Sequence, residues 1–235
     1  MMRPGIAMPM ALLASTLLLS ACGSAPPVPH WQANAASLMR NYQADWLEGH
    51  EVLARREFTL ALRATAATGD PARVARLYLV QCALRRAALD WSPCAHYADG
   101  RSVPSNLQEA AYARFLDGGW TNLKHFLLPP QYAALRGLDH APADRINSAL
   151  AAIADPLSRL IAASVALKRG QGDARTLRLA SDTAAQQGWR RPLLAWLKLR
   201  LAEARERNDA GEAALLAQRI RLVESSFSPN FSPKE

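Results

Sequence analysis

Three cysteines carry the clearest chemistry in this chain. Cys22 follows directly on an apolar stretch near the N-terminus, whereas Cys82 and Cys94 lie farther along the chain. A cysteine pair can close a disulfide, and together with His96 it would offer three ligands to a metal ion. A thiol at position 94 would instead be reactive if it lay near the start of a helix. The cellular compartment decides between these alternatives.

Residues 1–21 predict a secretory signal peptide that is removed from the mature protein. Arg3 supplies the positive charge, residues 6–19 form the apolar core, and the small residues Ser20 and Ala21 stand before the cleavage point. The apolar core has about 14 residues, which is shorter than the roughly 20 that a membrane-spanning helix needs. We therefore expect this segment to be absent from the folded protein.

The sequence Leu19-Ser20-Ala21-Cys22 resembles the lipobox of bacterial lipoproteins. This resemblance implies that the Cys22 thiol receives a diacylglycerol and that the mature chain begins at this residue with three acyl chains. Two or more acyl chains anchor a protein stably in a membrane. Gly23 stands where lipoproteins kept in the inner membrane often carry Asp. The resemblance therefore favours the outer membrane, with the protein facing the periplasm.

An oxidising periplasm favours the disulfide among the alternatives for the other two cysteines. An even pair of thiols inside a folded domain is expected to be oxidised there, so we predict a structural disulfide between Cys82 and Cys94. Three metal ligands without a Cys-x2-Cys spacing make a poor zinc site, and we predict no metal. The disulfide would tie the end of a helix over residues 71–88 to the following loop. By the loop-entropy model, closing a loop of about 13 residues contributes roughly 3 kcal/mol.

The charge balance is basic, and arginine accounts for most of it. The chain carries a formal net charge of +8, and its only lysines are Lys124, Lys168, Lys198 and Lys234. A basic surface can attract anionic lipid headgroups, lipopolysaccharide phosphates or acidic proteins. The arginines are scattered at helical spacing, which is more typical of solvated helix faces than of a binding groove. Nucleic acid is not an expected partner, because the signal directs the chain out of the cytoplasm.

From residue 31 onward the sequence predicts one helix after another. No alternating run of β-branched and aromatic residues is long enough to indicate a sheet, so we predict an all-α fold. Residues 22–30 are expected to form a lipidated, Pro-rich tether, residues 31–226 a helical domain and residues 227–235 an extended tail. The tail repeats Phe-Ser-Pro, and it is expected either to fray or to act as a docking peptide.

Asp-Pro pairs, glycines and N-cap residues mark where the individual helices begin and end. We predict helices over residues 32–67 with a break near Gly49, 71–88, 105–116, 120–128, 142–154, 156–169, 173–187, 192–207 and 210–225, with a turn or two over residues 130–136. The helix over residues 71–88 is apolar around most of its circumference, which predicts burial on several sides. In the last helix the apolar residues follow one face, which predicts packing on a single neighbour.

The helix-start caps recur with a weak period of roughly 34 residues, the length of a tetratricopeptide repeat. These caps are Asp70, Ser105, Asp173 and Asp209, with a looser candidate near His140. The chain resembles a tetratricopeptide-like array in which residues 156–187 and 192–225 form two neighbouring helix pairs and residues 50–88 a third. The Trp and Leu-Gly-x2-Tyr signature of that repeat is missing, and residues 105–140 do not divide into a pair. An irregular helical bundle is therefore the alternative.

No sequence motif identifies a reaction. A nucleophile elbow, a metalloprotease helix motif, a phosphate loop and a dinucleotide fingerprint are all missing from the sequence, so we predict neither a catalytic residue nor a cofactor. A peptidoglycan lytic enzyme would need a buried acid in a cleft. The candidates for such an acid are Glu48, Glu51, Glu57 and Glu109. Each lies in a charged amphipathic segment, where a solvated helix face is the preferred interpretation.

The sequence thus predicts a non-catalytic scaffold or adaptor at the outer membrane. The expected partner is a periplasmic or outer-membrane protein of envelope assembly, secretion or the cell wall, because helical arrays bind extended or helical segments along their inner curve. The alternatives are an enzyme or enzyme subunit that acts on peptidoglycan, and a binder of anionic glycolipid.

Overall fold

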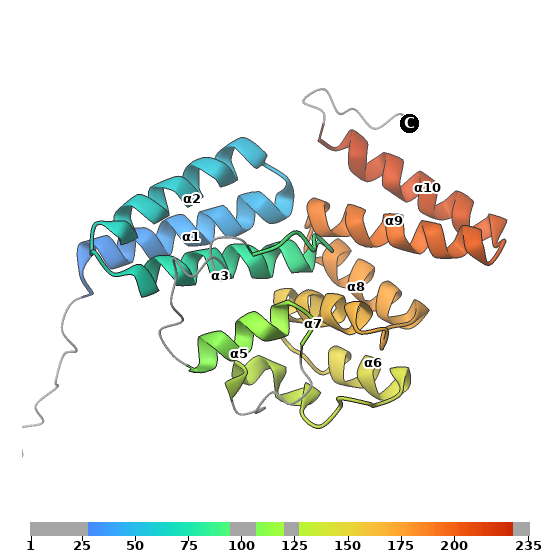
Figure 1. Ribbon diagram of the computed structural model, residues 1–235. Coiled ribbons are helices and arrows are strands. Elements are labelled where there is room, and N and C mark those ends of the chain that lie inside the picture. The colour runs from blue at the N-terminus through green and yellow to red at the C-terminus, as the bar shows by residue number, and fades with distance from the viewer. Residues whose placement is uncertain (1–27, 95–106, 120–126, 228–235) are drawn as a thin grey trace, which may run out of the picture.

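The computed structural model describes residues 28–94, 107–119 and 127–227. These residues form helices and no strand (Figure 1), which confirms the all-α prediction. The helices are α1 (His30–Glu48), α2 (Glu51–Ala66), α3 (Pro71–Ala87), α5 (Leu107–Leu116), the 3-10 helix η2 (Pro130–Leu135), α6 (Ala143–Ala151), α7 (Pro156–Lys168), α8 (Ala174–Gln186), α9 (Arg190–Glu206) and α10 (Ala210–Ser225). None of them combines the length and the apolar character that a membrane-spanning helix requires.

The predicted helix starts are present where an acidic N-cap precedes the helix. The Asp70 carboxylate accepts hydrogen bonds from the Ala72 and Arg73 amides, and Pro71 occupies the first helical position. Asp155 caps α7 in the same way. Asp173 caps α8, and these side-chain caps satisfy amide groups that the helix itself leaves unpaired. Hydrogen bonds within the first turn therefore determine where these helices begin.

Two predicted boundaries are wrong by a few residues. The helix expected over residues 142–154 ends at Ala151. The residue before Pro156 avoids the helical region of the backbone, and the Ile153 carbonyl accepts hydrogen bonds from Arg159 instead of from a helical amide. Helix α9 begins at Arg190, two residues before Pro192, because proline is tolerated anywhere in a first turn that needs no amide hydrogen bonds.

Some sequence predictions concern residues outside the described ranges. They are the signal peptide, Cys22 and most of the tether, the cap at Ser105, His96, most of the helix expected over residues 120–128, and the tail beyond Phe227.

The helices from α7 to α10 pack in chain order, each against the next (Figure 1). This arrangement matches the two neighbouring helix pairs predicted over residues 156–187 and 192–225.

The N-terminal part differs from the prediction. Helix α2 contacts α3, but it packs much more extensively on α1, so the first hairpin is α1–α2 and not residues 50–88. Gly49 makes this hairpin possible, because it turns the chain in the left-handed region at φ 86°.

Helix α3 joins the two parts of the molecule and is buried on several sides, as predicted. It contacts α1 and α2 on one side and α5 and α7 on the other. The larger hydrophobic cluster includes the fully buried side chains of Phe115, Leu160 and Trp196, and the Trp196 indole donates a hydrogen bond to the Ala87 carbonyl over 2.9 Å. A smaller cluster lies between α1, α2 and the Leu84 side chain of α3.

Candidate binding pocket

A pocket of about 380 Å³ lies where α2, α3 and the start of α9 meet over α1. We call it the α2–α3 pocket. Its lining residues are Tyr42, Trp46, Glu51, Ala54, Arg55, Phe58, Thr59, Gln81, Arg85, Asp90 and Arg191. The α1 and α3 contributions are each spaced four residues apart, at positions 42 and 46 and at positions 81 and 85. One face of each helix therefore supplies its part of the wall.

The floor of the pocket is aromatic. Tyr42 and Trp46 lie one turn apart on α1, and Phe58 of α2 packs against Tyr42 with ring centroids 4.8 Å apart. All three side chains are largely buried in the smaller hydrophobic cluster, which fixes their positions. Burial raises the pKa of Tyr42 to about 12, although the hydrogen bond with Gln81 acts in the opposite direction. The Tyr42 hydroxyl is therefore neutral and keeps its proton at physiological pH.

Three arginines from three helices surround this floor. The Arg191 guanidinium lies 4.7 Å from the centroid of the Trp46 ring, donates to the Trp46 carbonyl over 2.7 Å and pairs with Glu51 at 2.5 Å. Arg55 lies 3.6 Å from the other oxygen of the same carboxylate. Arg85 pairs with Asp90 at 2.8 Å. Three guanidinium groups thus share two carboxylates, which leaves an excess of one positive charge at the rim.

Asp90 holds its ion pair over a wide pH range. Burial alone would raise the pKa of this carboxyl group, but hydrogen bonds from Arg85 and from the side chain and amide of Ser92 lower it to about 2. Asp90 is therefore ionised at any physiological pH. Its paired Arg85 is oriented along the pocket wall and does not swing freely in solvent.

This arrangement is suited to binding a ligand that combines an apolar group with an anion. An aromatic floor accepts an aromatic or aliphatic group, and the arginine rim accepts a carboxylate or another anion. Within the described residues, no group of three or more His, Cys, Asp and Glu side chains could hold a metal ion. Searches of protein-family models, curated proteins and solved structures found no match to this chain.

The four glutamates that were candidate acids in the sequence have different surroundings in the structure. Glu51 lies at the pocket rim, where it is paired with two arginines. Glu48 is exposed, and Glu109 of α5 forms an ion pair with Arg76 of α3. Glu57 is partly buried but does not line the α2–α3 pocket. The pocket itself was missed in the sequence, since its residues are separated by up to 149 positions and only their packing joins them.

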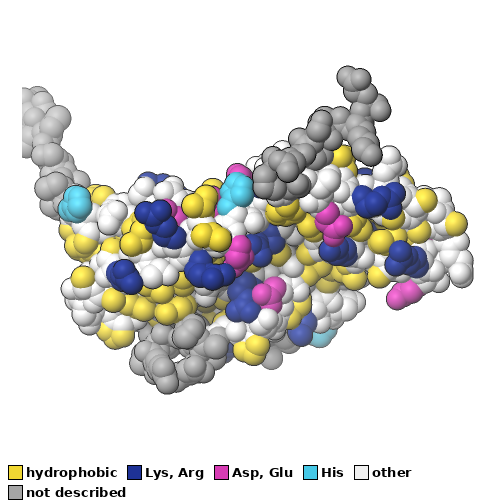
Figure 2. Space-filling view, turned by 90° about the horizontal axis from the view of Figure 1, so that it is seen from above, with side chains coloured by type: hydrophobic (Ala, Val, Ile, Leu, Met, Phe, Trp, Pro, Cys, Tyr) yellow, Lys and Arg dark blue, Asp and Glu magenta, His cyan; other side chains and the backbone are white. Residues whose placement is uncertain are grey.

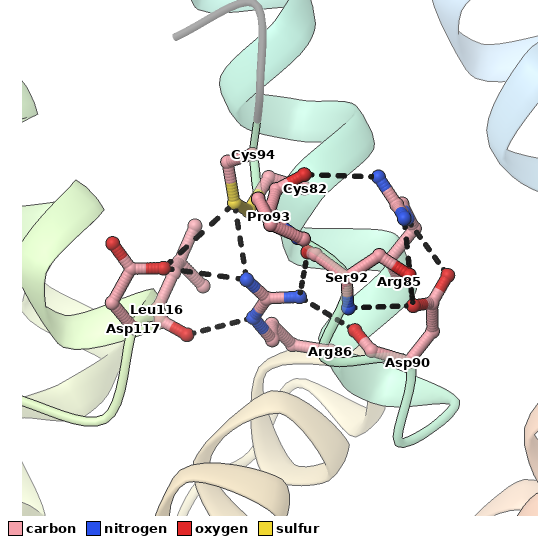
Figure 3. Close-up of a disulfide and its surroundings, with 9 residues drawn as sticks. All are labelled: Cys82, Arg85, Arg86, Asp90, Ser92, Pro93, Cys94, Leu116 and Asp117. Atoms are coloured by element: carbon pink, nitrogen blue, oxygen red, sulfur yellow. Dashed lines mark hydrogen bonds and ion pairs between the residues drawn. A yellow bond between two sulfur atoms is a disulfide. The ribbon is translucent and has the colours of Figure 1, made fainter. Parts of the chain in front are cut away.

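Cys82 and Cys94 come together beside the pocket wall, at the C-terminal end of α3 (Figure 3). The two side chains are joined in a disulfide, and their Cα atoms are 5.6 Å apart, within the usual range for such a bond. The crosslink joins the helix to the loop that carries Asp90, as predicted from the sequence. It therefore helps to hold the Asp90–Arg85 pair against the pocket.

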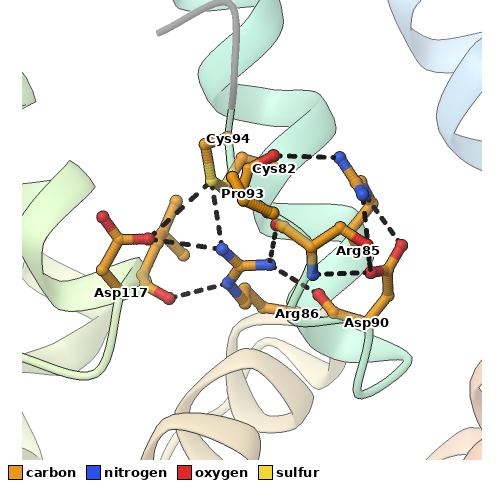
Figure 4. A network of polar contacts seen from close by, with 9 residues as sticks. Cys82, Arg85, Arg86, Asp90, Pro93, Cys94 and Asp117 are labelled. Carbon is orange, nitrogen blue, oxygen red and sulfur yellow. Dashed lines mark hydrogen bonds and ion pairs between the residues drawn. A yellow bond between two sulfur atoms is a disulfide. The ribbon is translucent and has the colours of Figure 1, made fainter. Parts of the chain in front are cut away.

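Arg86 is a second anchor for the same loop, and the sequence did not single it out. Its side chain is only 2% exposed. It donates to the Leu116 carbonyl over 2.8 Å, to the Asp90 carbonyl over 2.5 Å and to the Ser92 carbonyl over 3.1 Å (Figure 4). Burial lowers the pKa of Arg86, and the nearby Asp117 carboxylate at 3.3 Å opposes that effect.

Reduction is expected to lower the free energy of unfolding by roughly 3 kcal/mol, because it releases the loop between Cys82 and Cys94 in the unfolded chain. Urea denaturation with and without a reductant measures this difference. Mass spectrometry of the unreduced mature protein is the direct check: the disulfide form is 2 Da lighter than the dithiol. Two free thiols in protein taken from its native compartment would contradict the assignment.

Proposed function

We propose that this protein is a lipoprotein anchored in the outer membrane through Cys22 and facing the periplasm. It acts there as a non-catalytic helical adaptor. The α2–α3 pocket holds a segment of a protein partner that takes part in envelope assembly, in secretion or in the cell wall. The lipobox resemblance supports the anchor, and the pocket supports the binding role.

The observation that carries the binding role is the pairing of an aromatic floor with an arginine rim. Aromatic and arginine side chains are the residue types that contribute most at protein interfaces. The floor is already buried and packed within the smaller hydrophobic cluster, so a partner side chain can pack there without ordering it first. The excess positive charge at Arg55, Arg85 and Arg191 favours a segment that places a carboxylate beside an apolar side chain.

An enzyme of the cell wall is the second candidate, and one observation favours it. The Glu57 side chain has one buried carboxylate oxygen with no hydrogen-bond partner among the described residues. A buried carboxyl group can act as a general acid. Glu57 lies outside the pocket lining, however, and the lining residue Glu51 is already paired with Arg191. Release of muropeptides by the purified protein would support the enzyme over the adaptor.

The adaptor proposal predicts that filling the pocket abolishes partner capture. Thr59 is exposed at the pocket rim, and the Thr59→Trp variant places a large side chain there without removing a core residue. Bait protein is immobilised and exposed to solubilised envelope proteins, and captured proteins are quantified by mass spectrometry. We expect the wild-type bait to retain a defined partner and the variant to retain at least tenfold less, since a loss of about 1.4 kcal/mol is tenfold in affinity.

The Gln218→Trp variant is the matched control. Gln218 is exposed on α10 and does not line the pocket, so the same bulky side chain should leave partner capture unchanged. Circular dichroism of both variants checks that the helices are intact. Equal capture by wild-type protein and both variants would show that the α2–α3 pocket is not the binding site.

A further inference from the structure

Helix α2 turns a second face outward, next to the face that lines the α2–α3 pocket. The face has an aliphatic start, where Val52 is 78% and Leu53 47% exposed. It continues with the exposed arginines at positions 56 and 63, which do not line the pocket. Seen from the side on which α2 lies, basic and hydrophobic side chains are interspersed over the α1–α2 hairpin (Figure 2). This mixture is typical of helices that lie in the interface of a membrane.

The charge of the outward arginines of α2 is not neutralised by any residue that the structure describes. Glu51 is the exposed carboxylate of α2, and Arg191 of α9 already pairs with it. Arg56 and Arg63 form no ion pair with any described residue. The outward face of α2 is therefore available to an anionic surface, and its neighbouring carboxylate at Glu51 is paired with an arginine.

The position of the chain's N-terminal end brings this face close to the proposed anchor. Trp31 of α1 stacks on Arg73 of α3, 5.0 Å from the guanidinium carbon to the ring centroid, so α1 begins where α2 ends and α3 starts. Cys22 is eight residues before His30 and can lie at most about 28 Å from it. Helix α2 is itself about 24 Å long. An anchored chain therefore keeps the whole face within reach of the bilayer.

We propose that the outward face of α2 is a membrane-contact surface that binds anionic lipid headgroups. Arg56 and Arg63 pair with lipid phosphates, while Val52 and Leu53 enter the headgroup layer. The inference depends on the Cys22 anchor for the approach to the membrane, but it is independent of any partner in the pocket. It orients the molecule, because a hairpin that lies on the bilayer leaves α5, α6 and η2 facing away.

Sedimentation with vesicles tests this surface in the absence of any other protein. The buried core lies entirely between Ala35 and Ile220, so a chain that starts at residue 23 keeps the whole fold without its acyl chains. We expect it to bind vesicles that contain phosphatidylglycerol, and not pure phosphatidylcholine vesicles, at millimolar lipid and low salt. The variant Arg56→Gln, Arg63→Gln should bind roughly 20- to 30-fold more weakly, in line with the contribution of two basic residues near a charged surface.

The variant Arg114→Gln, Arg145→Gln removes the same charge from α5 and α6 and serves as the control. Both arginines are exposed, and we expect vesicle binding within twofold of wild type. Equal weakening by the two double variants would overturn the proposal, because net charge and not the α2 face would then govern binding. Absence of binding to anionic vesicles would also overturn the proposal. An acidic protein would then be the remaining candidate ligand for this face. Neither result bears on partner capture by the pocket.

Discussion

Replacing Arg86 with methionine is expected to lower the free energy of unfolding by about 3–5 kcal/mol. The guanidinium is buried and bonds three backbone carbonyls and the Asp117 carboxylate, which joins the loop after α3 to the end of α5. Methionine fills much of the volume but donates no hydrogen bond, so buried carbonyl groups lose their partner. Urea denaturation followed by circular dichroism measures the change.

The neighbouring Arg85 provides the matched control. It lies on the same helix and pairs with Asp90, but its side chain is 26% exposed and its partner 40%. Water can replace this pair, so Arg85→Met is expected to cost no more than about 1 kcal/mol. Arg86→Lys should remain destabilised, because a single ammonium group cannot reproduce the planar set of donors. Equal stabilities of the Arg85 and Arg86 variants would contradict the role assigned to the buried side chain.

The proposed lipid anchor predicts that replacing Cys22 with serine moves the protein almost completely from the membrane fraction to the soluble periplasmic fraction. A hydroxyl group cannot be lipidated through a thioether, and the variant would lose all of its acyl chains. Fractionation after a high-salt wash measures the change, and the wash removes protein held only by charge. Cys94→Ser should stay with the membrane. A salt-washed Cys22→Ser protein that still fractionates with outer membranes would contradict the anchor.

Much of the fold could be predicted because its signals are local. The pairs Asp70-Pro71 and Asp155-Pro156 start α3 and α7 through hydrogen bonds within a single turn. The apolar face of α10, with Leu216 and Ile220 buried, likewise follows from the spacing of residues in one helix. The pairing of the first hairpin was missed, since it depends on how Tyr42 and Phe58 pack across two helices.

The pocket and the Arg86 contacts could not be predicted, for the same physical reason. Arg191 reaches Trp46 and Glu51 only when α9 packs on α1, and nothing in the sequence near position 191 indicates that contact. Arg86 stands beside Arg85 in a helix rich in arginine, and both look like solvated charges in sequence. The carbonyl groups that accept hydrogen bonds from Arg86 lie at the C-terminal end of α5 and just after the C-terminal end of α3. These two helix ends meet only in the folded protein.

Photo-crosslinking in intact cells tests the adaptor role most directly. A benzoylphenylalanine residue at position 59 lies at the rim of the α2–α3 pocket, and the same residue at position 218 lies on the exposed surface of α10. The adaptor proposal predicts a discrete crosslinked protein from position 59 that is missing from position 218 and is lost when Arg55 is replaced by Glu. Indistinguishable crosslinking patterns at the two positions would contradict it.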